Sequence, residues 1–376
     1  MTSRHLVVSA VNFTEGGPLT ILLEGLESAA ATLGKEWRIT ALVHSESLIE
    51  SDRVHAIAFP ESKASWLNRL RLEWSGFAAL SRELKPDLWV SLHDVTPCVQ
   101  ARRQAVYCHN PSPFYRPSLT EARFDPRFFL FNKLYMRLYA LFIRRNYAVI
   151  VQQSWLRDAF RRKTGHPNIV VAYPGLVSAE PEEAGSAIPE GKPPRVPTPG
   201  RPLRLLYPSL PRVFKNMEVL CEAAKLLPAE VAEQIDVRMT LDGSENRWAR
   251  ELVRRYAGVQ GVRFIGRQDR DQMAAEYEDC DVVLFPSRLE TWGLPITEAK
   301  GFGKPLLVAA LPYARETTGT YGNVSFLPPN DPRAWSDAFV EMVGGRWKAE
   351  GNVAALPEQP FVRDWPALWR YLTEGL

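Results

Sequence analysis

Two carboxylates eight positions apart, Glu290 and Glu298, are well suited by type and spacing to bind a polar ligand. They flank a Gly-Leu-Pro turn that follows the apolar run at 281–287. Pro295 suits the first position of a helix and Gly293 permits close backbone approach, so unpaired N–H groups there can point at a diphosphate. Glu298 can then accept hydrogen bonds from ribose hydroxyls, while Glu290 can lie beside a sugar. A solvated glutamate and a helix-start acid are the plainer alternative.

Two basic residues, Arg212 and Lys215, follow another apolar run, LRLLYPS at 203–209. A departing phosphoryl group needs fixed positive charge nearby, and these side chains can supply it. A loop arginine and a helix-start lysine in water are the alternative interpretation.

Three further positions lie where strands are expected to end. Gly16 and Gly17 separate an apolar run from the helical pattern at 18–34, and glycines there let a ligand approach a helix N-terminus. His109 directly follows the run QAVYC, and His93 ends the run DLWVSL. Histidines at strand ends can hydrogen-bond a ligand, although most isolated histidines are surface or core groups. Tight turns also use glycine for its backbone freedom alone.

The sequence offers little for a metal ion. Asp269 and Asp271 form an Asp-x-Asp pair, but a helical pattern follows, so we interpret one of them as a helix N-cap. The four cysteines show no metal-ligand spacing and are expected to be reduced core residues: Cys98, Cys108, Cys221 and Cys280.

Short apolar runs that alternate with helical patterns predict an α/β fold with two doubly wound, Rossmann-like domains. We expect an N-terminal domain at 1–177, a Pro-rich linker at 178–202 and a C-terminal domain at 203–358, followed by a helix at 359–376 that can pack back on the N-terminal domain. Ligands of open parallel sheets bind at the carboxyl ends of the strands. The sequence therefore predicts a cleft that the two domains face.

The segment from Glu290 to Glu298 resembles the Glu-x-Phe/Trp-Gly-Leu-Pro-x-x-Glu motif of glycosyltransferase family 4, with Trp292 at the aromatic position. The order of elements is similar over nearly the whole chain. The resemblance implies the GT-B architecture, in which the domain at 1–177 binds the acceptor and the domain at 203–358 binds the nucleotide sugar. It also implies that Glu298 contacts the ribose and Glu290 the donor sugar or its phosphate. It also implies that backbone amides line the donor pocket at Thr291, Trp292, Gly293 and Leu294.

The resemblance implies roles for the other positions too. Lys215-Asn216 matches the family's basic position, but the usual arginine place holds Leu210, so the role of Arg212 stays open. Gly16 and Gly17 would face the donor phosphates, and His109 would reach the donor sugar. The backbone around Gly266 and Arg267 would read the base. The implied catalytic residues are His109, Arg212, Lys215 and Glu290.

The implied activity is retaining, metal-independent transfer of a hexose-type sugar from a nucleotide-diphosphate donor to a saccharide or lipid-linked saccharide. Bacterial surface polysaccharide synthesis, including lipopolysaccharide, is the expected setting. The nucleotide sugar is a substrate, and no cofactor is implied. A nucleotide-sugar epimerase on the same fold and a non-catalytic carbohydrate-binding protein remain alternatives. The motifs leave the base, the sugar and the linkage open, because these depend on pocket shape.

The net charge of +3 is unevenly distributed. Residues 1–170 hold 22 Lys and Arg against 15 Asp and Glu, and the rest hold 24 against 28. The segment 123–147 interleaves aromatic and basic residues, which can lie at an anionic membrane surface or form a packed helix with solvated arginines. No nucleic-acid motif is present. Without a signal peptide or a long apolar window, we expect a cytoplasmic protein, placed at the inner face of the cytoplasmic membrane if this segment binds lipid.

Overall fold

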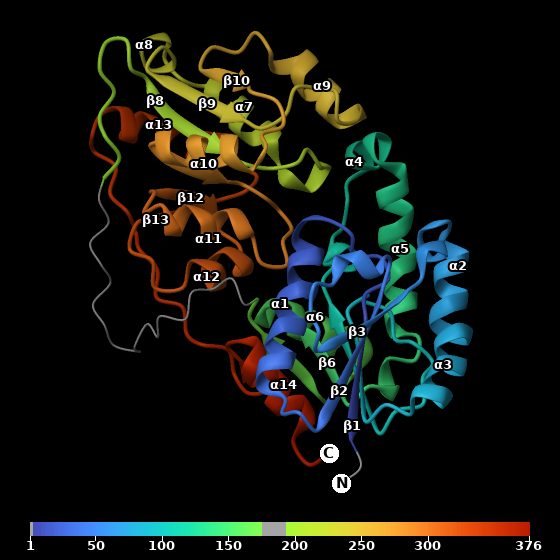
Figure 1. Ribbon diagram of the computed structural model, residues 1–376. Coiled ribbons are helices and arrows are strands. Elements are labelled where there is room, and N and C mark those ends of the chain that lie inside the picture. The colour runs from blue at the N-terminus through green and yellow to red at the C-terminus, as the bar shows by residue number, and fades with distance from the viewer. Residues whose placement is uncertain (1–2, 175–192) are drawn as a thin grey trace. The chain divides into compact units, whose positions relative to one another are not determined.

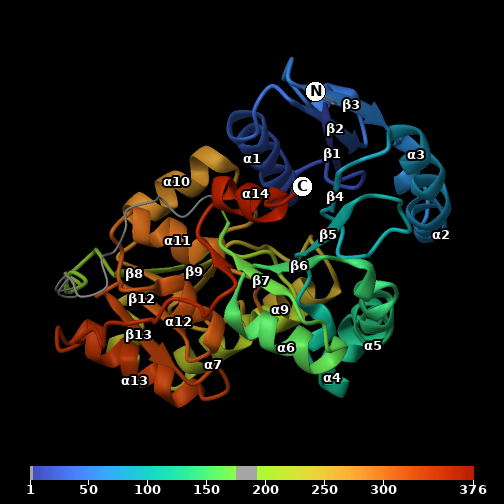
Figure 2. The ribbon, with the colours of Figure 1, turned by 90° about the horizontal axis from the view of Figure 1, so that it is seen from below.

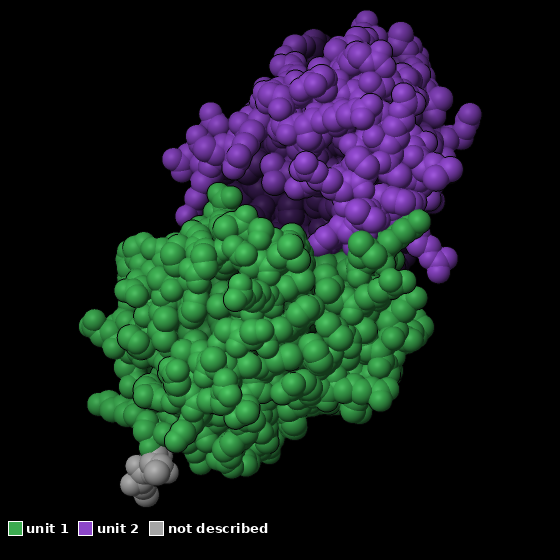
Figure 3. Space-filling model, turned by 90° about the vertical axis from the view of Figure 1, so that its right-hand side faces the viewer, with its two compact units in different colours: residues 1–114, 132–179, 357–376 green, residues 115–131, 180–356 purple. Residues whose placement is uncertain are grey.

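The computed structural model describes residues 3–174 and 193–376, which belong to two compact units. Unit 1 comprises Met1–Phe114, Asn132–Ala179 and Pro357–Leu376, and unit 2 comprises Tyr115–Phe131 and Glu180–Leu356 (Figure 3). Residues 178–192 of the predicted linker lie outside the described residues.

Unit 1 is built on an eight-stranded sheet whose neighbouring strands are all parallel (Figure 1). The strands are apolar and mostly buried because helices cover both faces of a parallel sheet. In spatial order they are β14 (Phe361–Val362), β7 (Ile169–Ala172), β6 (Ala148–Val151), β5 (Arg103–Cys108), β4 (Leu88–Ser91), β1 (Arg4–Ser9), β2 (Trp37–Val43) and β3 (Val54–Ala58).

The α-helices of unit 1 are α1 (Gly16–Thr32), α2 (Trp66–Arg71), α3 (Phe77–Leu84), the second part of α5 (Pro126–Ala140), α6 (Ser154–Thr164) and α14 (Trp365–Thr373). Helices α1 and α14 lie side by side (Figure 2), and Gly25 explains how they approach so closely. A Cβ at Gly25 would lie 3.1 Å from the Trp365 ring, and Trp369 Nε1 donates to the Gly25 carbonyl over 3.0 Å. The C-terminal segment 359–376 thus belongs to unit 1.

Unit 2 has a six-stranded parallel sheet. Its strands, in spatial order, are β10 (Val262–Phe264), β9 (Ile235–Met239), β8 (Leu203–Tyr207), β11 (Val282–Phe285), β12 (Leu306–Ala309) and β13 (Val324–Leu327). Its helices are α4 (Leu119–Phe124), the start of α5, α7 (Met217–Lys225), α8 (Ala229–Ala232), α9 (Arg247–Tyr256), α10 (Arg270–Asp279), α11 (Leu294–Gly301), α12 (Pro312–Thr318) and α13 (Pro332–Val343).

One segment is grouped differently from the expected boundaries. Residues 115–131, expected within an N-terminal domain at 1–177, belong to unit 2. Their aromatic rings pack on that unit: Phe128 lies 5.4 Å from Phe214, and Phe124 lies 4.9 Å from Trp248, between ring centroids. Burial of these rings provides the physical reason for the grouping.

Among the described residues, no helix combines the length and apolar character needed to cross a bilayer.

Candidate active site

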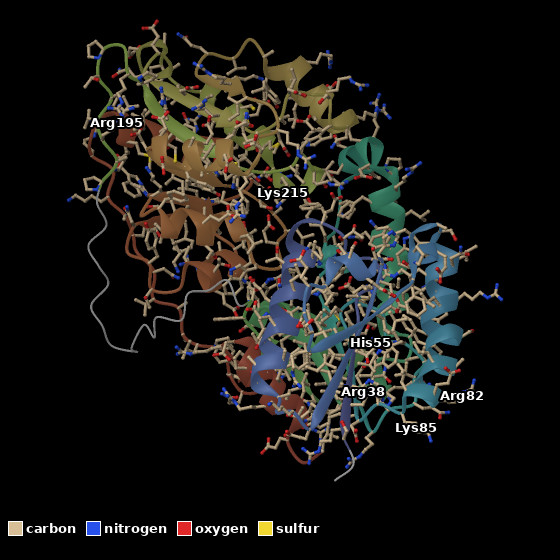
Figure 4. The ribbon with its side chains drawn as sticks, viewed as in Figure 1. Arg38, His55, Arg82, Lys85, Arg195 and Lys215 are labelled. Carbon is tan, nitrogen blue, oxygen red and sulfur yellow. The ribbon has the colours of Figure 1, made fainter. Side chains whose placement is uncertain are left out.

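Lys215 and Glu290 meet in unit 2, because they follow neighbouring strands. Strands β8 and β11 pair in parallel, so the loops after them emerge at the same edge of the sheet. Lys215 ends a short 3-10 helix, η6 (Val213–Lys215), in the loop after β8 (Figure 4). Its Nζ lies 2.5 Å from Glu290 Oε1, and the two side chains are only 17% and 12% exposed. The structure therefore holds a largely buried ion pair at the edge of the sheet where ligands of such folds bind.

Buried side chains hold the backbone around this ion pair. Asn216, fully buried and in a left-handed conformation, donates through Nδ2 to the carbonyls of Pro286 and Pro329 over 3.0 and 2.6 Å. The Tyr207 hydroxyl donates to the Lys215 carbonyl over 2.7 Å. Burial, with the charge of Glu290 adding to it, raises the pKa of Tyr207, which therefore remains a donor at neutral pH. Three loops are tied together at this point.

The turn from Thr291 to Leu294 leads directly into α11. Gly293 has φ +87°, and a Cβ there would lie 3.3 Å from the Phe285 ring, so both backbone and space favour glycine. The sequence suggested that Pro295 is the first residue of the helix. Helix α11 instead begins at Leu294, so Pro295 is its second residue. Pro lacks an N–H, and the first turn of a helix is where this loss costs least. Ile296 N already donates to the Gly293 carbonyl over 2.9 Å. The helix N-terminus can therefore offer an anion only the amides that precede Ile296.

The Trp292 side chain points into the unit rather than toward a ligand. It is 3% exposed, and its Nε1 donates to Thr297 Oγ1 over 2.9 Å. Thr317 Oγ1 donates to the Trp292 carbonyl. Trp292 thus anchors the turn, and its backbone is the part that can serve a ligand.

Glu298 lies on the exposed side of α11 and is held by a residue that the sequence analysis missed. The Tyr277 hydroxyl, on α10, donates to Glu298 Oε2 over 2.6 Å. Burial and the charge of Glu298 raise the pKa of Tyr277, so the phenol stays protonated. Glu298 Oε1 accepts no hydrogen bond from the described residues. The carboxylate is thereby oriented with one oxygen available to a diol.

The structure does not bring Arg212 to the ion pair. Arg212 is exposed, and its Nη1 lies 3.8 Å from Asp125 Oδ2. Arg288, which the sequence analysis did not consider, is more deeply placed. Its Nη1 lies 3.0 Å from Glu218 Oε1 and 3.3 Å from Glu121 Oε1. Because two carboxylates occupy its guanidinium, Arg288 links the segment 115–131 to the rest of unit 2.

Three other sequence-predicted positions lie just before α10: Gly266, Arg267 and Asp269. Arg267 is exposed, and Gly266 before it has φ +73°. Asp269 is the N-cap of α10: its Oδ1 accepts from Gln272 N over 2.9 Å, and Gln272 Oε1 accepts from Asp269 N over 3.0 Å. The structure thus bears out the capping interpretation of Asp269. Within 3–174 and 193–376, no three His, Cys, Asp or Glu side chains are arranged to hold a metal ion.

In unit 1, His109 follows β5 and is fixed by its backbone. Asp94 Oδ1 accepts hydrogen bonds from the amides of His109 and Asn110 over 2.5 and 3.0 Å. The His109 ring stacks on Tyr107 at 4.2 Å between centroids, and burial lowers its pKa to about 3. The imidazole is therefore neutral at physiological pH. Its Nε2 is buried and has no partner in the described part of the chain.

His93 and the glycine turn complete the predicted positions of unit 1. Phe13 makes edge contacts with the rings of His93 and His109, at 5.4 and 5.5 Å. Both nitrogens of His93 are buried and unpartnered among the described residues. Gly16 is the first residue of α1 with φ +64°, and a Cβ there would meet nothing within 4 Å. Conformation rather than space therefore favours glycine at 16, and Gly17 lies in the first turn.

Residues 194–349, most of unit 2, match the family model described as glycosyl transferases group 1. The C-terminal domain belongs to the group 1 glycosyltransferases. This match confirms the resemblance for the domain that carries Lys215, Glu290 and Glu298.

Curated relatives match over part of their length. The chain is 30% identical over 140 residues to the D-inositol 3-phosphate glycosyltransferase of Xylanimonas cellulosilytica, covering 36% of this chain and 32% of that protein. It is 28% identical over 128 residues to the O-antigen chain mannosyltransferase B of Escherichia coli, covering 34% and 33%. The matched part thus spans about a third of each of these relatives.

The fold extends beyond the matched domain. The solved structure of WaaG, a glycosyltransferase involved in lipopolysaccharide biosynthesis, is similar to this fold. The alignment covers 91% of this chain and 92% of the WaaG chain. The TM-score is 0.60 at 14% sequence identity. The group 1 domain is therefore part of a GT-B fold, as the sequence predicted.

Proposed function

We propose that this chain is a glycosyltransferase that moves a hexose from a nucleotide-diphosphate donor to a saccharide or lipid-linked saccharide. The supporting observation is the Lys215–Glu290 ion pair beside the glycine turn that opens α11. Lys215 would supply fixed positive charge where a diphosphate would meet the amides of a helix N-terminus, and Glu290 holds the lysine in place. Glu298, one turn further along the same helix, would accept hydrogen bonds from the ribose. Bacterial surface polysaccharide is the proposed setting, supported by the match to the O-antigen mannosyltransferase.

In the proposed reaction, the bond between the anomeric carbon and the phosphate oxygen breaks, and the acceptor oxygen attacks from the same face. The acceptor proton passes to an oxygen of the departing diphosphate, so no protein base is required. Lys215 and the amides around Gly293 stabilise the charge that develops on the diphosphate. Stabilisation of the leaving group by these protein groups supports a reaction that needs no metal.

Glu290 and His109 have proposed roles on the sugar. Glu290, positioned by Lys215, would accept hydrogen bonds from sugar hydroxyls. His109 would hydrogen-bond a hydroxyl through its buried Nε2. Since burial keeps its pKa near 3, the ring is a neutral partner rather than a proton donor to the leaving group.

Acceptor-dependent release of nucleoside diphosphate tests the activity. The purified chain should release it from one member of a panel of UDP-, GDP-, dTDP- and ADP-sugars when a bacterial glycolipid fraction is added, and EDTA should leave the rate unchanged. Conversion of the donor sugar without acceptor would indicate an epimerase instead. Loss of activity with EDTA, restored by a divalent cation, would contradict the metal-independent reaction.

We also propose that unit 1 contacts an anionic membrane. Leu67 on α2, Leu134 on α5 and Phe142 are 78%, 46% and 38% exposed. Contact between the rings of Trp66 and Tyr135, 5.6 Å apart, holds α2 beside α5. Within unit 1, residues 132–147 contain four Lys and Arg and no Asp or Glu. Exposed apolar side chains among basic residues favour the surface of an anionic bilayer.

Cosedimentation with phosphatidylglycerol vesicles tests this contact. The double variant Arg137→Glu/Arg144→Glu should lose most vesicle binding, because each basic residue near the surface contributes about 1 kcal/mol. Arg137→Glu and Arg144→Glu are also measured singly. Arg82→Glu, which changes an exposed arginine on α3 by the same charge, is the control for each of them. Equal binding by the wild type and the double variant would remove the proposal.

A further inference from the structure

Unit 2 contains a cavity of about 470 Å³ that is lined by residues of α4 and α9. Helices α4 and α9 lie near one another in the ribbon (Figure 1). Four arginines and one glutamate supply its charged groups. The lining residues are Arg123, Phe124, Arg247, Arg250, Glu251 and Arg254.

The helical spacing of α9 brings the arginines together. Arg247, Arg250 and Arg254 are three and four positions apart, which places them on one face of the helix. Asn246 fixes the start of α9, since its Oδ1 accepts from Ala249 N over 2.9 Å. The three guanidinium groups therefore project from a capped helix rather than from a loop.

The aromatic floor of the cavity is also fixed. The centroid of the Phe124 ring lies 4.9 Å from the centroid of the Trp248 ring. It lies 5.8 Å from Cζ of the Arg247 guanidinium. Arg247 Nη1 donates to the Arg123 carbonyl over 3.4 Å. These contacts hold the end of α4 against α9, with an apolar ring beside the charged groups.

The positive charge of the cavity exceeds what its carboxylate can neutralise. Glu251 accepts from Arg254 Nε and Nη2 over 2.9 and 2.7 Å, so Arg254 occupies both of its oxygens. No carboxylate of the described residues forms an ion pair with Arg123, Arg247 or Arg250. Three neighbouring guanidinium groups repel one another unless an anion lies between them, and their planar donors match the oxygens of a phosphate.

We propose that this cavity binds a phosphate group carried by the acceptor, a phosphorylated saccharide whose sugar ring lies against Phe124. The assignment of the ligand as acceptor rests on the proposed function, whereas the phosphate chemistry rests on the arginines alone. The cavity would then determine which acceptors the enzyme accepts, in addition to the donor site at Lys215 and Glu298.

Calorimetry with glucose 6-phosphate and with glucose, at low ionic strength, tests the site. The wild type should bind the phosphorylated sugar and not glucose. Arg250→Ala should weaken binding about tenfold or more, because a charge-assisted hydrogen bond is lost. The affinity of Arg250→Lys should lie between those of the wild type and Arg250→Ala, because lysine keeps the positive charge but lacks the planar guanidinium donors.

The control is Arg255→Ala on the same helix, because Arg255 Nη2 pairs with Glu222 Oε1 at 2.7 Å and does not line the cavity. It should bind glucose 6-phosphate as the wild type does. Equal loss in this control, or no binding by the wild type, would overturn the proposal. Loss in Lys215→Ala but not in Arg250→Ala would place the phosphate at the donor site and also overturn it.

Two further measurements separate the source of the phosphate and the underlying activity. Arg250→Glu should leave binding to phosphatidylglycerol vesicles unchanged. If this variant binds vesicles less well, and the wild type does not bind glucose 6-phosphate, the arginines bind lipid headgroups and the acceptor assignment is overturned.

Nucleoside diphosphate should bind Arg250→Ala normally. Failure of all donor binding in the wild type, with glucose 6-phosphate still bound at the arginines, would contradict the proposed function and not the phosphate site.

Discussion

Lys215→Ala should lower the rate of sugar transfer by about two to three orders of magnitude, the loss expected when one preorganised group that stabilises developing charge is removed. The reason is that Lys215 is a largely buried cation beside the helix N-terminus that would hold the diphosphate. Single-turnover kinetics at saturating donor measures the effect. The loss should appear mainly in kcat, since the charge on the diphosphate grows as the bond breaks.

This variant also leaves Glu290 without its ion-pair partner, so stability must be measured alongside activity. Removing one member of a buried pair can cost several kcal/mol, whereas removing both can cost much less. Lys215→Ala/Glu290→Gln should therefore recover thermal stability without recovering activity. Lys225→Ala, an exposed lysine on α7, is the matched control. A folded Lys215→Ala protein with wild-type kcat would contradict the role of Lys215.

Glu298→Ala should weaken the binding of the nucleoside diphosphate at least about tenfold, because hydrogen bonds to a charged group contribute about 1.5–3 kcal/mol. The carboxylate is oriented by Tyr277, so Tyr277→Phe should weaken binding by a smaller factor. Isothermal titration calorimetry with the preferred nucleoside diphosphate measures both.

Glu278→Ala is the control for Glu298, since Glu278 is an exposed glutamate on α10, next to Tyr277 in the sequence. It should bind the nucleotide as the wild type does. The deoxyribose form of the nucleotide should bind the wild type more weakly and should lose less on Glu298→Ala. Equal losses for the ribose and deoxyribose forms would show that Glu298 does not hold the sugar hydroxyls.

The strand-and-helix rhythm predicted the fold because parallel strands are apolar on both faces and end at one edge. The same rule placed the loops of Lys215 and Glu290 at the carboxyl ends of strands, but only the structure shows that these strands are neighbours and that the two side chains pair. The Asp269 N-cap was also accessible, since capping depends on local sequence. These features need only short-range patterns.

Contacts between distant elements were not predictable in this way. Tyr277 meets Glu298 only because α10 and α11 pack together, and no spacing in the sequence signals it. Arg288 was overlooked because its carboxylate partner Glu121 is 167 positions away. The same absence of a local signal applies to the segment 115–131, whose aromatic contacts decide that it belongs to unit 2.

A crystal structure with the preferred nucleoside diphosphate bound tests the central claim most directly. It should show the phosphates against the amides of residues 291–294 with Lys215 Nζ within hydrogen-bond distance, and the ribose hydroxyls on Glu298. A nucleotide bound elsewhere, or bound with Lys215 Nζ beyond hydrogen-bond distance of the phosphates and Glu298 facing solvent, would contradict the account.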